Sequence, residues 1–261
     1  MGKLKLGILG NGYLADIIVE AGLKGMLDEY ELVGVLGRTR EKTELLAKKG
    51  GCRACSTIDE LLALAPDYVA EAASVQSVKD CGVKILASGA SMIVLSIGAF
   101  ADKEFYGQVK ETAAVHGTRV YIASGAVGGF DVLRTISLMG QAEAGIRTKK
   151  GPASLKGTPL FEERLMEDTQ ESHVFHGNAK EAISLLPTKV NVAVASSLAT
   201  VGPEDTHVDI YSVPGMVGDD HKITSEIEGV KAVVDIYSST SAIAGWSVVA
   251  VLQNIVSPIV F

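Results

Sequence analysis

An apolar run at residues 4–9 ends in a glycine-rich turn that leads directly into a helix-like stretch, Tyr13 to Lys24. The turn has the spacing Gly7-x-x-Gly10-x-Gly12-x-x-Ala15. Its second glycine permits a tight turn, its third lets the backbone approach a ligand, and the small Ala15 lets helix and strand pack closely. Between a strand and a helix, this spacing predicts a site for the pyrophosphate of a dinucleotide, bound by the free N–H groups of the helix N-terminus. The alternative is a tight turn of an α/β protein that binds no cofactor.

The first 123 residues alternate apolar runs with helix-like stretches. We expect strands at 4–9, 31–36, 68–72, 91–96 and 119–122, and helices at 13–24, 40–49, 57–64, 75–87 and 101–116. Such alternation is typical of βαβ units. The sequence therefore predicts an α/β fold, with a Rossmann-type doubly wound parallel sheet in a dinucleotide-binding domain at 1–123.

The pattern changes from about residue 146. Strands are expected at 206–213, 221–228 and 232–238, and helices at 178–186 and 190–200. Residues 206–213 alternate as in a sheet with two unlike faces. We predict a second, α+β domain at 124–239 with a mostly antiparallel sheet. The last segment, 240–261, contains a helix at 241–256 that is expected to pack back on the first domain.

Composition excludes several classes of protein. The chain has 261 residues, 47% of them hydrophobic, and a net charge of −7 with scattered basic residues, so we expect a globular protein that binds no nucleic acid. The apolar segment 241–261 contains Gln253, Asn254 and Pro258, which indicates a buried helix and no membrane span. A chain with three cysteines and no signal peptide is expected in the cytoplasm. Cys52-x-x-Cys55 lacks a second cysteine pair, so no metal site is predicted.

The end of the second predicted strand bears on the choice of nicotinamide cofactor. In this fold an acidic residue there binds the ribose 2′-hydroxyl of NAD, whereas an arginine accommodates the 2′-phosphate of NADP. The strand runs into Gly37-Arg38-Thr39-Arg40 without an acid. We expect NADP or NAD, with NADP favoured; the alternative is that Arg38 and Arg40 are solvated loop charges. The residues expected to contact the cofactor are Gly10, Asn11, Gly12, Tyr13, Leu14, Arg38, Thr39, Ala72, Ala73, Ser96, Gly98 and Ala99.

Further motifs run through nearly the whole chain. They are Glu71-Ala72-Ala73, the blocks 96–102 and 124–131, Phe175-His-Gly-Asn-Ala179, Pro187-x-x-Val190-Asn191-Val-Ala193 and the stretch 240–247. With the glycine turn, this set resembles the L-aspartate dehydrogenase family. The resemblance implies a nicotinamide-binding domain joined to a substrate domain that also forms a homodimer. It also implies interconversion of L-aspartate with iminosuccinate, or with oxaloacetate plus ammonia.

The same resemblance implies a catalytic histidine in an Asn-x-His-x-Ile motif, which matches His221 followed by Ile223. The sequence departs from the family pattern at three positions. Asp219 stands where the family usually has asparagine, Gly218 where it often has arginine, and Lys189 where it usually has another asparagine. Because these changes lie in the substrate-facing region, the identity of the substrate stays open.

The residues themselves also favour a histidine for proton transfer, because its pKa lies near neutral pH. His221 stands beside two aspartates, and either Asp219 or Asp220 is a candidate to orient it. The alternative is a loop histidine in a solvated acidic turn.

The other four histidines carry weaker predictions. His116 is expected at the surface, and His207 at the start of a strand, facing solvent. His173 and His176 are expected on an edge strand, with one of them near the ligand crevice.

A substrate carboxylate has several candidate partners. The loop 124–129 precedes the helix-like stretch 131–139, so it either binds a carboxylate at that helix N-terminus or serves as a hinge between domains. A dicarboxylate needs cations, and Lys189 is favoured over Lys149-Lys150, a pair expected in a solvated turn. The predicted substrate-binding residues are Ser124, Gly125, Ala126, Lys189, Asn191 and Asp219.

These observations favour an NAD(P)-dependent oxidoreductase that acts on the CH–NH2 group of an amino acid, with aspartate first among the candidates. Its partners would be a small amino acid or the corresponding imino or oxo acid, and a second copy of the chain. One alternative is an imine reductase or homoserine-type dehydrogenase of the same two-domain plan. Another is a non-catalytic NAD(P)-binding regulator that kept the fold and lost the site.

Overall fold

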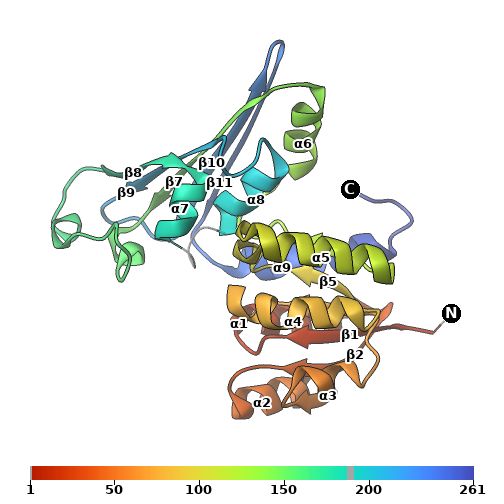
Figure 1. Cartoon of the computed structure of the whole chain (residues 1–261). Coiled ribbons are helices and arrows are strands. Elements are labelled where there is room, and N and C mark those ends of the chain that lie inside the picture. Colours follow the sequence, from red (N-terminus) through yellow and green to blue (C-terminus); the bar gives the residue numbers. More distant parts are fainter. Residues whose placement is uncertain (1, 187–190) are drawn as a thin grey trace. The chain divides into compact units, whose positions relative to one another are not determined.

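The computed structural model describes residues 2–186 and 191–261 (Figure 1). The chain divides into two compact units. One comprises residues 1–125 and 242–261, and the other comprises residues 126–241.

Within the described residues, the first unit contains a six-stranded sheet in the order β3-β2-β1-β4-β5-β6, with all neighbouring strands parallel. The strands are β1 (Leu4–Leu9), β2 (Tyr30–Leu36), β3 (Arg53–Cys55), β4 (Tyr68–Glu71), β5 (Ser91–Val94) and β6 (Val120–Ile122). The helices are α1 (Tyr13–Leu23), α2 (Arg40–Gly50), α3 (Ile58–Leu62), α4 (Val75–Ala87), α5 (Lys103–His116) and α9 (Ala242–Val256), with a 3-10 turn at Ile97–Ala101. The predicted Rossmann-type fold is confirmed, and β3 is an addition to the five expected strands.

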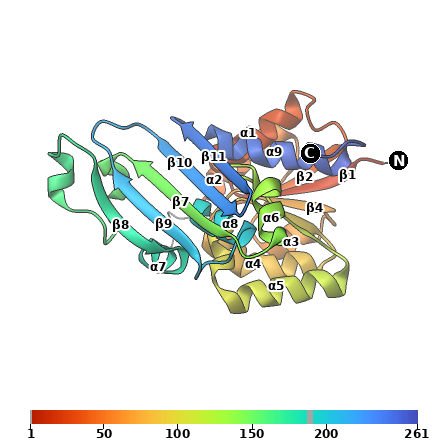
Figure 2. The same ribbon diagram turned by 90° about the horizontal axis from the view of Figure 1, so that it is seen from above.

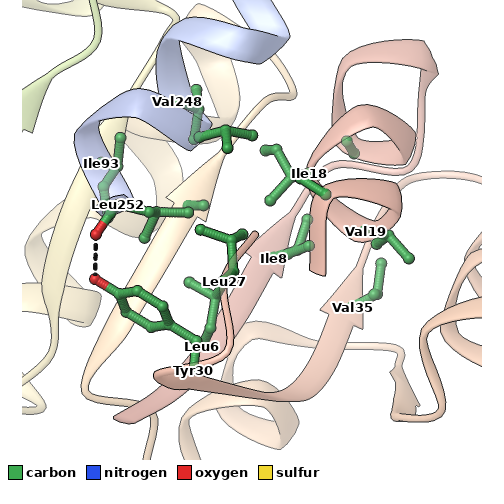
Figure 3. Packing of buried hydrophobic residues seen from close by; sticks show 14 of the residues in the cluster. Leu6, Ile8, Ile18, Val19, Leu27, Tyr30, Val35, Ile93, Val248 and Leu252 are labelled. Atoms are coloured by element: carbon green, nitrogen blue, oxygen red, sulfur yellow. Dashed lines mark hydrogen bonds between the residues drawn. The ribbon is translucent and has the colours of Figure 1, made fainter. Parts of the chain in front are cut away.

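The core of this unit lies between β1, β2 and β5 and the helices α1 and α9 (Figure 3). Ile8 on β1 and Ile18 on α1 pack in the same cluster as Val248 and Leu252 on α9. The phenol of Tyr30 donates a hydrogen bond of 2.8 Å to the Leu252 carbonyl oxygen. The C-terminal helix therefore completes the hydrophobic core of the first unit. None of the helices in the described parts of the chain is both long and apolar enough to cross a membrane.

Within its described residues, the second unit contains a five-stranded sheet in the order β11-β10-β7-β9-β8, which Figure 2 shows strand by strand. Only β7 and β9 are parallel among its neighbouring pairs, so the predicted mostly antiparallel sheet is confirmed for the described residues. The strands are β7 (Glu143–Lys150), β8 (Ser172–Asn178), β9 (Thr206–Ser212), β10 (Asp219–Ile227) and β11 (Val230–Ser238). The helices are α6 (Phe130–Met139), α7 (Ala179–Leu185) and α8 (Asn191–Ala199), with 3-10 turns at Pro152–Leu155 and Glu163–Met166.

The sheet of the second unit has one covered face and one open face. Helices α6, α7 and α8 contact the covered face, where Thr148, Ile210 and His221 are buried. Because successive side chains of a strand point to opposite sides, Arg147, Asp209 and Lys222 lie on the open face. This arrangement corrects one sequence prediction: Lys149 and Lys150 lie at the end of strand β7, not in a solvated turn.

Candidate functional site

The glycine turn between β1 and α1 has the backbone geometry that its spacing predicts. Gly10 has φ +135°, a region that favours glycine, and an added Cβ would collide with the carbonyl oxygen of Ala72. Gly12 is the N-cap of α1 and no side chain caps the helix there, while an added Cβ at Gly12 would meet no other described atom within 4 Å. The N-terminal N–H groups of α1 and the open space beside Gly12 fit an anionic group.

A cavity of about 620 Å³ lies beside this turn within the first unit. Six of the predicted cofactor residues line it: Gly10, Asn11, Gly12, Arg38, Ala72 and Ala73. The other six do not: Tyr13, Leu14, Thr39, Ser96, Gly98 and Ala99. The lining also includes polar groups that the sequence did not indicate, namely Ser56, Ser74, Gln76, Ser77 and Asp80. Ser74 caps helix α4 by accepting a hydrogen bond from Ser77 N–H, a capping signal that could have extended the prediction beyond Ala73.

Asn11 joins the glycine turn to the segment that follows β2. Its side-chain amide donates hydrogen bonds of 2.9 Å to the Thr39 carbonyl oxygen and to the Thr43 hydroxyl. The two arginines of this segment differ. Arg40 forms an ion pair with Glu44 and bonds Ser56, whereas Arg38 is exposed, lines the cavity and forms no ion pair with another described residue. Arg38 is therefore the cation available to a ligand at the end of β2.

Glu71 is a completely buried carboxylate at the end of β4. Its Oε1 accepts hydrogen bonds from Ala73 N–H (2.8 Å) and the Ser96 hydroxyl (2.7 Å), and its Oε2 accepts from the N–H groups of Leu95 (3.1 Å) and Ser96 (2.9 Å). Burial raises the pKa of Glu71, and the four donors oppose that rise. The carboxylate holds the loop after β4, which lines the cavity, to the loop after β5. Ser96 therefore does not line the cavity; it donates two hydrogen bonds to Glu71.

In the loop after β6 the chain leaves the first unit and enters the second. The division of the chain falls between Gly125 and Ala126, and Gly125 has φ +65°. Its N–H donates to the hydroxyl of Ser247 on α9 at 3.0 Å, and Ser124 is half-buried. Because this N–H is already bonded, the geometry favours the hinge role of the loop over carboxylate binding by Gly125.

His221 lies on strand β10 and is 4% exposed, so it is not a loop histidine in a solvated turn. Its Nδ1 is 2.9 Å from the hydroxyl oxygen of Thr148 on β7. Burial lowers the pKa of His221 to about 4; the charge of Lys150 lowers it as well, and the charge of Asp219 opposes both. The imidazole is therefore neutral at pH 7, and with its proton on Nδ1 and donated to Thr148, Nε2 is free to accept a proton.

Asp219 and Lys150 form an ion pair beside this imidazole. The Lys150 ammonium is 3.0 Å from Asp219 Oδ2, and the same oxygen is 3.9 Å from His221 Nε2. The Lys150 side chain is only 12% exposed. The distance of 3.9 Å between Asp219 and the ring exceeds hydrogen-bond length. The residue that holds the ring by a hydrogen bond is therefore Thr148, which the sequence prediction missed.

Two other sequence predictions concern the same region. Asp220 does not orient His221, because neighbouring residues of a strand point to opposite faces and Asp220 lies on the open one. Asn191 is the half-buried first residue of α8. Lys189 lies outside the described residues.

Burial raises the pKa of all three cysteines, which disfavours the reactive thiolate. Cys52, Cys55 and Cys81 are free thiols, and burial raises the pKa of Cys52 to about 11. This thiol stays protonated at neutral pH, where the thiolate is the reactive form.

A parallel doubly wound sheet with an anion-binding glycine turn, followed by a second unit with a buried histidine, defines a two-unit NAD(P)-binding oxidoreductase. Family models match both parts: "Homoserine dehydrogenase, NAD binding domain" over residues 6–123, and "Aspartate dehydrogenase, C-terminal" over residues 131–255. The L-aspartate dehydrogenase of Methanococcus maripaludis is 33% identical over 265 residues, covering 98% of each chain. The chain belongs to the L-aspartate dehydrogenase family.

A further relative and a solved structure support the same family. The L-aspartate dehydrogenase of Methanosarcina mazei is 33% identical over 98% of both chains. The crystal structure of aspartate dehydrogenase from Thermotoga maritima matches with a TM-score of 0.78 and 26% identity, covering 99% of each chain. An amine dehydrogenase from Mycobacterium smegmatis, 12% identical with a TM-score of 0.59, shares the fold.

Proposed function

We propose that the chain is an NAD(P)-dependent amino-acid dehydrogenase that interconverts L-aspartate with iminosuccinate, or with oxaloacetate and ammonia. The observation that carries this proposal is the buried, neutral His221, held by Thr148 beside Lys150 and Asp219 in a chain of this family. We assign residues 1–123 with 240–261 to cofactor binding, and residues 124–239 to substrate binding and dimerisation.

The cavity of the first unit fits a dinucleotide. Gly10 and Gly12 with the N-terminus of α1 would hold the pyrophosphate, Ala72 and Ala73 would line the site, and Arg38 would meet the adenosine ribose. When bound, the nicotinamide supplies the acceptor or donor of hydride. Because Arg38 is exposed and no described acid stands in its place after β2, we propose a preference for the 2′-phosphate of NADP.

His221 would move the proton. Oxidation of the substrate amine to an imine releases hydride and a proton, and hydrolysis of the imine requires water to lose a proton. A neutral imidazole can accept either proton at Nε2 while Thr148 fixes the ring through Nδ1. Removal of this group should lower the rate constant for turnover more than it alters binding.

Charged groups around His221 would position the substrate. Lys150 can bind a carboxylate and Asp219 can bind an ammonium group, because each carries the opposite charge and both lie beside the imidazole. We retain Lys189, Asn191, Ser124 and Ala126 as further candidates for the substrate site. A homodimer and a cytoplasmic location complete the proposal.

The test is oxidation of NADPH or NADH by the purified chain with oxaloacetate plus ammonia, beside a panel of 2-oxo acids and cyclic imines. We expect turnover with oxaloacetate, and a loss in His221→Ala of about 10²- to 10⁴-fold in kcat. Thr118→Ala, in the first unit, is the matched control and should leave kcat unchanged.

Three results would contradict the proposal in different ways. Turnover only with cyclic imines would favour an imine reductase, and turnover with aspartate semialdehyde would favour a homoserine-type dehydrogenase. Tight binding of NADPH with no turnover on any compound would favour a non-catalytic regulator.

A further inference from the structure

Two histidines and an aspartate meet at the edge of the second unit's sheet. His173 and His176 lie on the edge strand β8, and Asp209 lies on the neighbouring strand β9. Asp209 Oδ1 is 2.8 Å from His173 Nε2 and 2.9 Å from His176 Nδ1. These three candidate ligand atoms all lie within 4.8 Å of one another. The sequence predicted an edge strand for the two histidines but no metal site.

An irregularity in strand β8 brings the histidines together. Residues three apart on a regular strand point to opposite faces of a sheet. The pairing of β8 with β9 shifts between His173 and Phe175, so that His173 pairs with Tyr211 and His176 pairs with Asp209. An extra residue of this kind re-aims the following side chains. The shift therefore places both imidazoles on the open face, which also carries Asp209.

The spacing of the three atoms suits a tetrahedral metal ion. Bonds of 2.0–2.1 Å to imidazole nitrogen and carboxylate oxygen place neighbouring ligand atoms about 3.3 Å apart. The distances of 2.8 and 2.9 Å from the carboxylate oxygen to the two nitrogens need to lengthen by about 0.4–0.5 Å to admit the ion. The side chains of His173, His176 and Asp209 are 41%, 70% and 33% exposed, so an ion can enter from solvent.

The surroundings support the same geometry. The His173 ring stacks on the ring of Tyr211, with 4.5 Å between centroids, which fixes its plane. Arg147 is the register neighbour of Asp209 on β7, yet within the described parts of the chain the two form no ion pair. The carboxylate charge is therefore available to a cation.

We propose that His173, His176 and Asp209 form a binding site for one divalent transition-metal ion, of which Zn²⁺ fits best. Two imidazoles and one carboxylate are ligands that Zn²⁺ prefers, and water completes a four-coordinate site. The bound ion ties the edge strand β8 to β9 and stabilises the second unit.

This site is separate from the proposed catalytic histidine. Arg147 pairs with Asp209 and Thr148 pairs with Ile210 between β7 and β9, so Asp209 and Thr148 point to opposite faces. His221 contacts Thr148 on the covered face. The inference therefore does not rest on the proposed function, and its variants need not change turnover.

The test uses the full chain, free of any affinity tag and stripped with EDTA. Calorimetric titration with Zn²⁺ should give one site per chain, and Co²⁺ should give the visible absorption bands of a tetrahedral complex. His173→Ala, His176→Ala and Asp209→Asn should each weaken binding by at least about tenfold. His116→Ala, which removes an exposed histidine from α5, is the matched control and should bind like the parent chain.

Thermal unfolding provides a second readout. Zn²⁺ at about 100 times its Kd should raise the Tm of the parent chain by several degrees, and should leave the Tm of the three ligand variants unchanged. Equal Tm values of parent and variants in EDTA would show that the variants fold. The proposal is overturned if no Zn²⁺ binds, if the variants bind as the parent does, or if Co²⁺ binds without tetrahedral bands.

Discussion

Glu71 illustrates how a single residue can organise a cofactor loop without lining the cavity. In Glu71→Gln, one carboxylate oxygen becomes an NH2 group that faces N–H or O–H donors, so at least one buried donor loses its partner. We expect a loss of about 1–3 kcal/mol in the free energy of unfolding. We also expect a higher Kd for NADPH, because Ala73 is no longer held; denaturant unfolding and fluorescence titration measure the two effects.

Ser96→Ala is the control for this prediction, because it removes one hydroxyl donor and leaves the three backbone bonds to Glu71 in place. Its cost should be about 1 kcal/mol, and its Kd for NADPH should stay near the parent value. If Glu71→Gln bound NADPH as tightly as the parent, Glu71 would not position the loop.

His221 should make stability depend on pH. The pKa of His221 is about 4 in the folded chain, against an ordinary value of 6.5. Between these values the unfolded chain binds more protons than the folded chain, so the free energy of unfolding falls as the pH is lowered from 6.5 towards 4. The slope is at most about 1.4 kcal/mol per pH unit for this one group.

Urea unfolding at several pH values between 4.5 and 7.5 measures that slope. His221→Gln removes the titrating group, and its amide can still bond Thr148. We therefore expect the variant to lose stability less steeply than the parent below pH 6.5. Parallel curves for the two chains would mean that the imidazole is protonated as readily in the folded protein as in the unfolded one.

At the scale of elements, the first unit was predictable because its strands and helices carry strong local signals. Buried parallel strands are continuous apolar runs, and glycine or a capping residue marks the ends of several elements. Strand β3 has only three residues, too few for any periodicity. Strand β7 was missed because its sequence, Glu143–Lys150, places charged residues on the open face and ends in two lysines.

Those two lysines provide a matched pair for the substrate site. Lys150 is nearly buried and pairs with Asp219 beside His221, whereas Lys149 pairs with Glu171 and lies on the open face. If Lys150 binds a substrate carboxylate, Lys150→Ala should raise KM by about tenfold to 100-fold, with a smaller change in kcat. Lys149→Ala should leave both constants near the parent values. Steady-state kinetics with oxaloacetate and ammonia measures them, and equal effects of the two variants would remove Lys150 from the site.

At the scale of the whole molecule, the candidate site depends on long-range pairing that sequence periodicity does not specify. Thr148 and His221 are 73 positions apart and meet because β7 and β10 are neighbours with Thr148 opposite His221. The sequence indicated His221 through a family resemblance and through the two aspartates beside it. It could not indicate Thr148, since a threonine on a strand is ordinary and its partner depends on the register. For the same reason it could not indicate that the Lys150 side chain is only 12% exposed.

The open face of the second sheet bears on the oligomeric state. Val233 and Tyr237 on β11 are exposed on this face, at 48% and 61%. A second copy of the chain would cover these two side chains, as expected for a homodimer.

Light scattering after size-exclusion chromatography should therefore give twice the chain mass of 27.3 kDa. Val233→Lys places a charge on the open face, where the second copy would have to bury it, and should shift the mass towards that of one chain. Val115→Lys, at a valine on α5 that is 73% exposed against 48% for Val233, is the control and should leave the mass unchanged. A parent chain that stays monomeric at micromolar concentration would contradict the homodimer. A dimer that Val233→Lys leaves intact would move the interface away from the open face.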